Sequence, residues 1–86
     1  MYALTTRSKK AEKQFYKLLE TRSSIRKKLQ QLQEHPRSAI GAHKLKGKLA
    51  GKWSADLGAD IRLVYEVDDA NKEIIVAAAG SHKIYK

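Results

Sequence analysis

The sequence lacks cysteine and contains one proline and one tryptophan among its 86 residues. Without cysteine the chain has no disulfide, no thiolate nucleophile and no cysteine ligands for a zinc finger. Its longest apolar run, IIVAAA, is far shorter than the roughly 18 to 20 residues that a membrane-spanning helix needs. We therefore expect a cytoplasmic protein that makes no use of a membrane, folded as a single domain over residues 1–86.

Acidic residues are also scarce, because 9 of them stand against 18 lysines and arginines, which gives a net charge of +9. The imbalance lies in residues 1–52, which hold 14 of the basic residues and only three acidic ones. The simplest explanation is a solvated pair of helices. A surface of this charge also predicts a polyanionic partner, with nucleic acid first and an acidic protein second.

The N-terminal half has the pattern of a strand followed by two helices. Near the start of the sequence Tyr2 and Leu4 alternate with small or polar neighbours, as in a short strand. Residues 9–20 carry apolar side chains at helical spacing, with Ser8 placed as the N-cap. A second helix is indicated by the spacing of Ile25, Leu29 and Leu32. Pro36 should end that helix near His35, so the two helices form a hairpin.

The hydrophobic period changes to two after residue 43. In DIRLVYEV four large apolar residues alternate with Asp60, Arg62, Val64 and Glu66, and we expect the first set to face the helices: Ile61, Leu63, Tyr65 and Val67. DDANK is a polar turn, and EIIVAAAG is a final buried strand that pairs antiparallel across it. The order predicts an α+β fold, with an N-terminal strand and a helical hairpin packed on an antiparallel sheet of about four strands.

The strand pleat places two charged residues together. Asp60 and Arg62 are two positions apart, so both should project from the face opposite the core. One interpretation is a solvated salt bridge of little energetic value. The other is an arginine that binds a phosphate, because the planar guanidinium fork matches phosphate oxygens.

Two histidines add the possibility of proton transfer at the same face. His82 follows the strand after that of Arg62, and HKLKGK supplies His43 with three lysines beside it, Lys44, Lys46 and Lys48. Histidine, arginine and lysine together provide acid, base and charge stabilisation for cleavage of an RNA phosphodiester. RNA carries its own nucleophile in the 2′-hydroxyl, so this chemistry requires no metal or cofactor, and the sequence has no HExxH motif or carboxylate cluster.

Two aromatic residues have alternative roles. Trp53 shares parity with Ala55 and Leu57, which favours packing in the core over stacking on a base. Tyr85 lies near the C-terminal residue of the sequence, where an exposed ring can stack on a base or hydrogen-bond a phosphate.

The segments HKLKG, DIRLVYEV and GSHKIY resemble, in order and spacing, the toxins of the RelE/ParE superfamily of type II toxin–antitoxin systems. Within it the chain is most similar to the YafQ branch of RelE-type mRNA interferases. The resemblance implies a RelE-like fold with a twisted sheet. It also implies a ribosome-dependent endoribonuclease that cuts mRNA in the ribosomal A site by 2′-hydroxyl attack, and a cognate antitoxin protein as partner.

The resemblance also implies roles for individual residues. His43, Asp60 and His82 match the acid/base set of the YafQ pattern, whereas Arg62 matches the arginine with which RelE binds the scissile phosphate. Asp56 stands where YafQ has a further histidine, so its role is open. The catalytic lysines of RelE are not reproduced, and the candidates to replace them are Lys46, Lys48 and Lys52.

Two other functions remain open from the sequence. A ParE-like inhibitor of DNA gyrase would use the same fold without nuclease chemistry. A basic RNA-binding module would bind RNA in a strongly salt-dependent manner without cleaving it.

Overall fold

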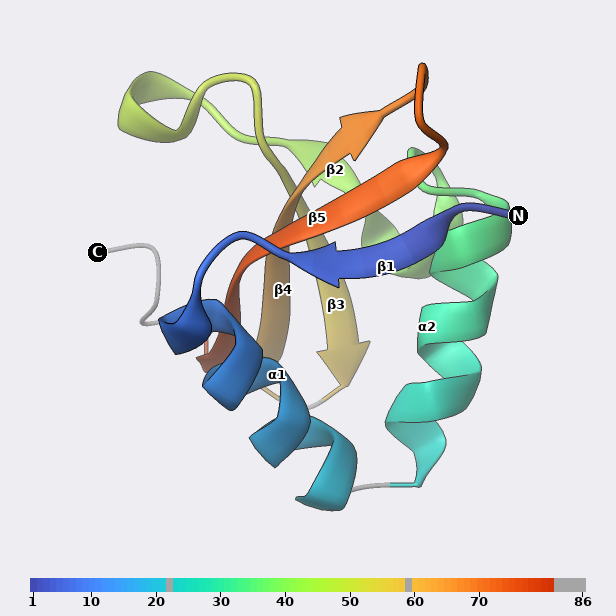
Figure 1. Cartoon of the computed structure of the whole chain (residues 1–86), viewed down its shortest axis with the longest axis vertical. Helices are drawn as coiled ribbons and strands as arrows, with labels where there is room; N and C mark the ends of the chain where they lie inside the picture. The colour runs from blue at the N-terminus through green and yellow to red at the C-terminus, as the bar shows by residue number, and fades with distance from the viewer. Residues whose placement is uncertain (22, 59, 82–86) are drawn as a thin grey trace.

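The computed structural model describes residues 1–21, 23–58 and 60–81. Along the chain the elements are β1 (Ala3–Thr6), α1 (Lys9–Thr21), α2 (Ser24–Glu34), the 3-10 turn η1 (Ala39–Gly41), β2 (His43–Lys44), the 3-10 turn η2 (Gly47–Leu49), β3 (Trp53–Gly58), β4 (Ile61–Asp68) and β5 (Glu73–Ser81). Figure 1 shows the two helices beside one twisted sheet. Within the described residues, no helix is long and apolar enough to cross a membrane.

The helical hairpin forms where the sequence predicts it. The Ala11 N–H donates to the Ser8 hydroxyl at 3.1 Å, which confirms Ser8 as the N-cap of α1. The apolar stripe of α2 is fully buried, as its spacing predicts. Pro36 follows the last turn of α2 and is buried. The Tyr65 hydroxyl of β4 donates to its carbonyl at 2.6 Å, which connects this segment to the sheet.

The sheet differs from the expected one in size and direction. It has five strands in the order β1-β5-β4-β3-β2, and β1 runs parallel to β5 while the other pairs are antiparallel. The expectation of about four antiparallel strands is therefore corrected to a five-stranded mixed sheet. The parallel pair joins Ala3 to Glu73, and such a distant pairing leaves no local turn signal in the sequence.

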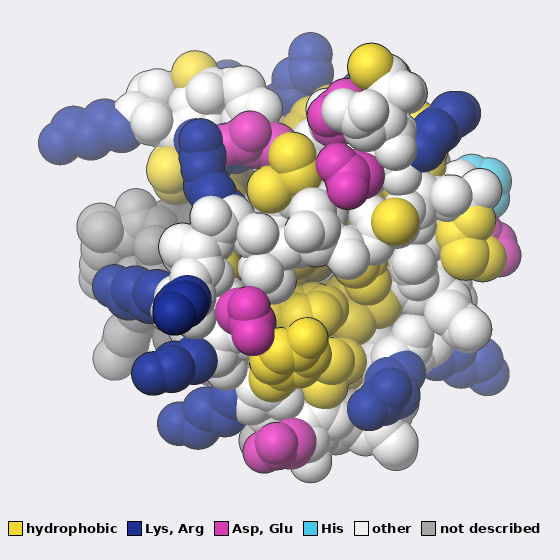
Figure 2. All heavy atoms as spheres, in the orientation of Figure 1, with side chains coloured by type: hydrophobic (Ala, Val, Ile, Leu, Met, Phe, Trp, Pro, Cys, Tyr) yellow, Lys and Arg dark blue, Asp and Glu magenta, His cyan; other side chains and the backbone are white. Residues whose placement is uncertain are grey.

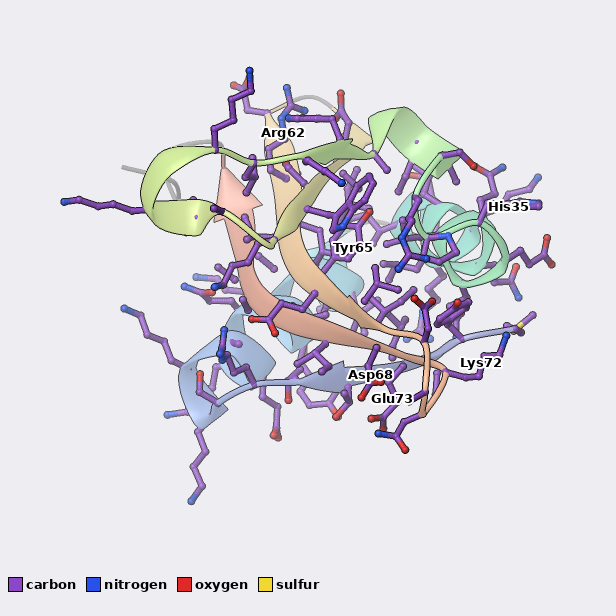
Figure 3. The ribbon with its side chains drawn as sticks, turned by 90° about the horizontal axis from the view of Figure 1, so that it is seen from above. His35, Arg62, Tyr65, Asp68, Lys72 and Glu73 are labelled. Carbon is purple, nitrogen blue, oxygen red and sulfur yellow. The ribbon has the colours of Figure 1, made fainter. Side chains whose placement is uncertain are left out.

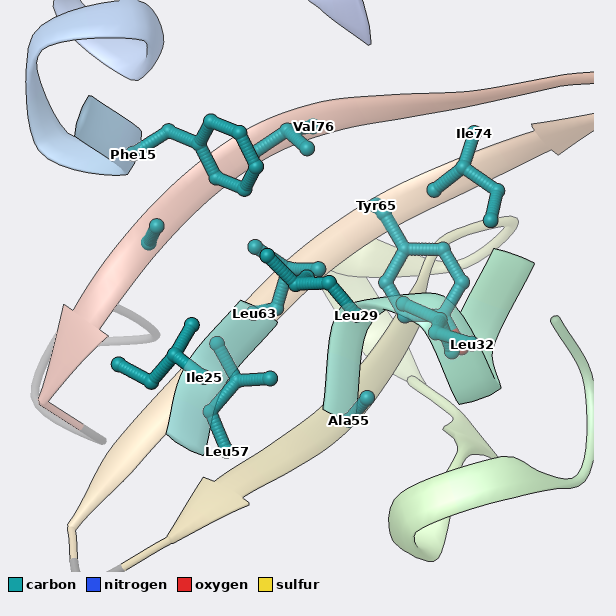
Figure 4. Packing of buried hydrophobic residues seen from close by; sticks show 11 residues of the cluster. Phe15, Ile25, Leu29, Leu32, Ala55, Leu57, Leu63, Tyr65, Ile74 and Val76 are labelled. Carbon is teal, nitrogen blue, oxygen red and sulfur yellow. The ribbon is translucent and has the colours of Figure 1, made fainter. Parts of the chain in front are cut away.

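The core lies between the helices and one face of the sheet. Leu63 and Tyr65 of β4 are fully buried there, and Ile61 and Val67 pack against the same cluster, so the predicted inward face is confirmed. Figure 4 shows α2 side chains against those of β3 and β4, with Phe15 of α1 close to β5. Among the described residues, side chains of α1 and α2 pack on this face, and the charged residues Asp56 and Arg62 of β3 and β4 project from the opposite one.

A bulge interrupts the last strand. The register between β4 and β5 shifts between Val64 and Tyr65, so that Ala78 opposes Val64 while Val76 opposes Tyr65. Ile74 and Val76 are buried at alternate positions of β5, and after the extra residue the next buried position is Ala79 instead of residue 78. This explains why the run IIVAAA shows no simple alternation in the sequence.

Candidate functional site

Three candidate residues share the outer face of the sheet, the face opposite the core. His43 opposes Ser54 across β2 and β3, and Asp56 opposes Arg62 across β3 and β4. Opposed residues of antiparallel strands project from the same face, and Ser54 and Asp56 are two positions apart on β3. The backbones of His43 and Arg62 are thus about 10 Å apart across the strands and about 7 Å apart along them.

Arg62 and Asp56 form an ion pair on this face, near the end of the β3–β4 hairpin. Arg62 Nη1 lies 2.6 Å from Asp56 Oδ1, with the two side chains 30% and 48% exposed. This Nη1 atom is buried, and among the described residues it has no hydrogen-bond partner of good geometry. The guanidinium is therefore held by charge attraction, and part of it stays open to a ligand.

Besides Arg62, two other groups act on the Asp56 carboxylate, the Gly58 N–H and the charge of Lys28. The Gly58 N–H donates to Asp56 Oδ1 at 3.0 Å, and this bond is the main cause of the lowered pKa of Asp56. The charges of Arg62 and Lys28 lower that pKa further. Asp56 is consequently ionised at neutral pH, so it can position Arg62 but cannot act as a general acid.

His43 lies at the sheet edge with an exposed side chain. Its Nδ1 is 3.1 Å from the Gly41 carbonyl oxygen. A carbonyl oxygen can only accept, so Nδ1 is the donor in this contact and Nε2 is the ring nitrogen left for a substrate. Gly41 adopts φ +70°, and a Cβ built on it would lie 3.7 Å from the Asp56 Cβ, so η1 brings His43 and Asp56 into one neighbourhood.

The remaining sequence candidates have different positions. Asp60 is exposed in the turn before β4, which begins at Ile61, and the carboxylate that pairs with Arg62 is that of Asp56. Lys46 and Lys48 are exposed in the loop between β2 and β3. His82 and Tyr85 lie outside the described residues, and β5 is described up to Ser81, with its Gly80 opposite Arg62.

Lys52 belongs to a second charged group on the same sheet. Its Nζ lies 3.5 Å from Glu66 Oε1, and Arg7 also pairs with Glu66. Glu66 is four positions after Arg62 along β4, and Figure 3 shows Arg62 far from the turn that contains Asp68 and Lys72 at the other end of the strand. Part of the positive charge of Lys52 is thus offset by Glu66.

Lys28 is a neighbour of the site that sequence reasoning missed. A Cβ built on Gly58 would lie 3.0 Å from Lys28 Nζ, so this lysine of α2 reaches the end of the β3–β4 hairpin. Its charge also acts on Asp56. In the sequence Lys28 is one of several lysines on the polar side of a helix, and nothing local distinguishes it from the others.

Comparison with known proteins gives one family and several related structures. A family model described as ParE toxin of type II toxin–antitoxin system, parDE, matches residues 6–84. No curated protein matches the chain.

Solved toxin structures match the fold over nearly their whole length. A copper-bound mutant toxin from Helicobacter pylori is 29% identical, with 100% of each chain covered and a TM-score of 0.75. A chain of the YoeB–YefM complex from Staphylococcus aureus is 27% identical, with 95% of this chain and 98% of that chain covered and a TM-score of 0.69. A YafQ mutant from E. coli shares the fold at 18% identity, with 99% and 98% covered and a TM-score of 0.69.

Proposed function

The chain belongs to the family of ParE toxins of type II toxin–antitoxin systems, and we propose that it is a cytoplasmic, ribosome-dependent endoribonuclease that cleaves mRNA without a metal. The family confirms the resemblance to the RelE/ParE superfamily. The observation that carries the proposal is that His43 and Arg62 share the face of the sheet opposite the core, with Asp56 holding the arginine. A toxin that only binds its target has no need for this combination.

Arg62 binds the scissile phosphate in the proposed reaction. Its planar fork is suited to two phosphate oxygens, and it stabilises the charge that develops on the pentacoordinate phosphorus. The ionised Asp56 holds the guanidinium before substrate arrives, which reduces the cost of ordering it. Lys46 and Lys48 then supply positive charge along the RNA strand.

Two proton transfers complete the cleavage. His43 Nε2 takes the proton of the 2′-hydroxyl while the 2′-oxygen forms a bond to phosphorus. The bond from phosphorus to the 5′-oxygen breaks, and His82 gives that oxygen a proton, leaving a 2′,3′-cyclic phosphate and a 5′-hydroxyl. Asp60 is the alternative base, and its position in the turn before β4 makes it the second choice. Tyr85 stacks on a base or orients the substrate.

An antitoxin is the proposed protein partner, in line with the YoeB–YefM complex among the related structures. Figure 2 shows a hollow of apolar side chains between α1 and α2, with basic side chains on both sides. It has a volume of about 510 Å³ and its floor consists of Leu4, Phe15, Leu19 and Leu29. Arg26 and Lys27 at its rim favour an acidic, amphipathic segment of the antitoxin.

The test is primer extension on a defined mRNA in a reconstituted translation reaction. Wild-type protein should produce discrete cuts in register with codons, only when ribosomes are present. The His43→Gln, Arg62→Ala and His82→Ala variants should lose the cuts, whereas Lys17→Ala removes one exposed charge of α1 and should keep them. Intact mRNA during active translation would overturn the proposal.

Inhibition of DNA gyrase is the second candidate, because the matching family model is that of ParE toxins. A supercoiling assay with purified gyrase separates the two. Blocked supercoiling together with intact mRNA would favour gyrase, and normal supercoiling with cut mRNA would favour the ribonuclease.

A further inference from the structure

A second pocket lies at the edge of the sheet formed by β2 and β3, on the face opposite to that of His43. It has a volume of about 350 Å³ and is lined by Arg37, Lys44, Gly51, Trp53 and Val67. Lys44 opposes Trp53 across β2 and β3, one position after the pair of His43 and Ser54. Because neighbouring positions of a strand project to opposite faces, this pocket is on the core side of the sheet edge, away from Arg62.

Trp53 has two environments in this pocket. Its indole packs against the core cluster, which confirms the packing role expected from its parity, but the side chain remains partly exposed. The Lys44 ammonium lies over the ring, 5.8 Å from its centroid, and the Arg37 guanidinium lies over it at 6.0 Å. An aromatic face with two cations in reach is complementary to a ligand that is flat, aromatic and negatively charged.

The two cations differ in how they are held. Arg37 donates to both oxygens of Asp69, at 3.1 and 2.7 Å, so its position is fixed and part of its charge is offset. Lys44 has an exposed side chain on the two-residue edge strand. Lys44 is therefore the better placed of the two to pair with an incoming phosphate, while Arg37 provides a rigid wall.

The remaining walls leave room for a planar group. Gly51 adopts φ +90°, and a Cβ built there would meet no atom within 4 Å, so this side of the pocket is open. Val67 contributes an apolar surface. The volume of about 350 Å³ is at the small end of the range for small-molecule sites, about 300 to 1,000 Å³, and is enough for one nucleotide.

We propose that this pocket binds one nucleotide of single-stranded RNA, with its base stacked on Trp53 and its phosphate on Lys44 and Arg37. An acidic peptide would satisfy the two cations but would leave the indole face without an aromatic partner, so the observations favour RNA. The site is separate from the face that carries His43 and Arg62. The proposal therefore does not rest on the cleavage reaction.

Trp53 is the only tryptophan of the chain, so its fluorescence reports directly on this pocket. The full chain is titrated with a short single-stranded RNA that is 2′-O-methylated and cannot be cleaved. Saturable quenching of Trp53 is expected, and Lys44→Ala should weaken the binding about 5-fold to 10-fold. Lys17→Ala removes an equal charge from α1, far from β2, and should bind like wild type.

A second titration follows end-labelled RNA by anisotropy, so that Trp53 itself can be changed. Trp53→Phe keeps an aromatic ring and should bind nearly as well, whereas Trp53→Leu should weaken binding about 10-fold or more. Circular dichroism identifies a Leu variant that fails to fold, and the comparison of Lys44→Ala with Lys17→Ala then decides. Equal affinity for those two variants would overturn the proposal.

Two competitor ligands complete the test. Ribose 5-phosphate lacks the base, and an acidic peptide of equal charge lacks the planar ring, so each should quench Trp53 at least 10-fold less effectively than the RNA at equal concentration. Equal quenching by ribose 5-phosphate would reduce the pocket to an anion site. Tighter binding of the peptide would assign it to a protein partner.

Discussion

Arg62 and Asp56 face each other on neighbouring strands, with Nη1 of the arginine 2.6 Å from Oδ1 of the aspartate. A partly exposed ion pair of this kind contributes little to stability, about 0 to 1 kcal/mol. Its effect on ligand binding is larger, because a guanidinium already held in place loses less freedom when a phosphate arrives. In the proposed function, the pair prepares Arg62 for an anionic substrate.

Replacement of Arg62 should remove most of the cleavage activity. Arg62→Ala deletes the phosphate ligand and is expected to lower kcat about 100-fold to 1,000-fold. Arg62→Lys keeps one positive charge without the fork and should fall between that variant and wild type. Single-turnover cleavage of a defined mRNA on stalled ribosomes measures the effect. A wild-type rate for a folded Arg62→Ala protein would rule out this role.

Replacement of His43 should separate catalysis from binding. Glutamine can hydrogen-bond but cannot transfer a proton, so His43→Gln should lower kcat about 100-fold to 10,000-fold with little change in KM. The matched variant is Asp60→Asn, which should retain activity if His43 is the base. The opposite pattern, an active His43→Gln protein and an inactive Asp60→Asn protein, would move the base to the turn before β4.

The sequence predicts the local elements of this fold well and its distant pairings poorly. The stripe of α2 and the alternation of β4 follow from periods of 3.6 and two, and both are found in the structure. The parallel pairing of β1 with β5 joins residues 70 positions apart along the chain, such as Ala3 and Glu73. No local pattern encodes it, because it results from packing of the whole domain.

The candidate site likewise combines a local feature that the sequence predicts with contacts that it does not. Strand parity correctly places Arg62 on the face opposite the core, but the partner of Arg62 depends on where the β3–β4 hairpin turns. The register shifts between Asp56 and Gly58, β4 begins after Asp60, and Asp56 becomes the opposed residue. The contribution of Lys28 depends on how α2 crosses the sheet, which its own sequence does not specify.

Asp69 should account for part of the acid sensitivity of the fold. Hydrogen bonds from Arg37 and then Tyr2 lower its pKa from 3.8 to about 2. A carboxylate whose pKa is lowered in the folded state stabilises the protein above its ordinary pKa and loses that contribution as the pH falls toward the folded value. The stabilisation should therefore be complete above about pH 5 and disappear between about pH 4 and pH 2.

Asp69→Asn tests this directly. The variant should melt at a lower temperature than wild type at pH 6, and the difference should shrink as the pH is lowered to 2.5. The side chains of Asp69 and of its partner Arg37 are each about half exposed, so the stabilisation should also decrease at high salt. Thermal melting followed by circular dichroism across this range is sufficient. A difference that stays constant with pH would show that Asp69 is not the titrating group.

Tyr65→Phe should destabilise the fold although the ring is retained. Tyr65 is fully buried in β4, and its hydroxyl donates to the Pro36 carbonyl at 2.6 Å, which ties the segment after α2 to the sheet (Figure 3). Burial raises the pKa of Tyr65 far above its ordinary value, so the hydroxyl keeps its proton and remains a donor. Phenylalanine leaves the carbonyl unsatisfied at a cost of about 1 to 2 kcal/mol.

Urea denaturation gives the free energy of unfolding for this comparison. The midpoint for Tyr65→Phe should fall while the slope stays the same, because the unfolded chain exposes the same surface. Tyr16 is 55% exposed on α1, so Tyr16→Phe is the matched control and should stay within about 0.5 kcal/mol of wild type. Equal midpoints for Tyr65→Phe and wild type would mean that water satisfies the Pro36 carbonyl once the hydroxyl is removed, and that this hydrogen bond does not hold α2 to the sheet.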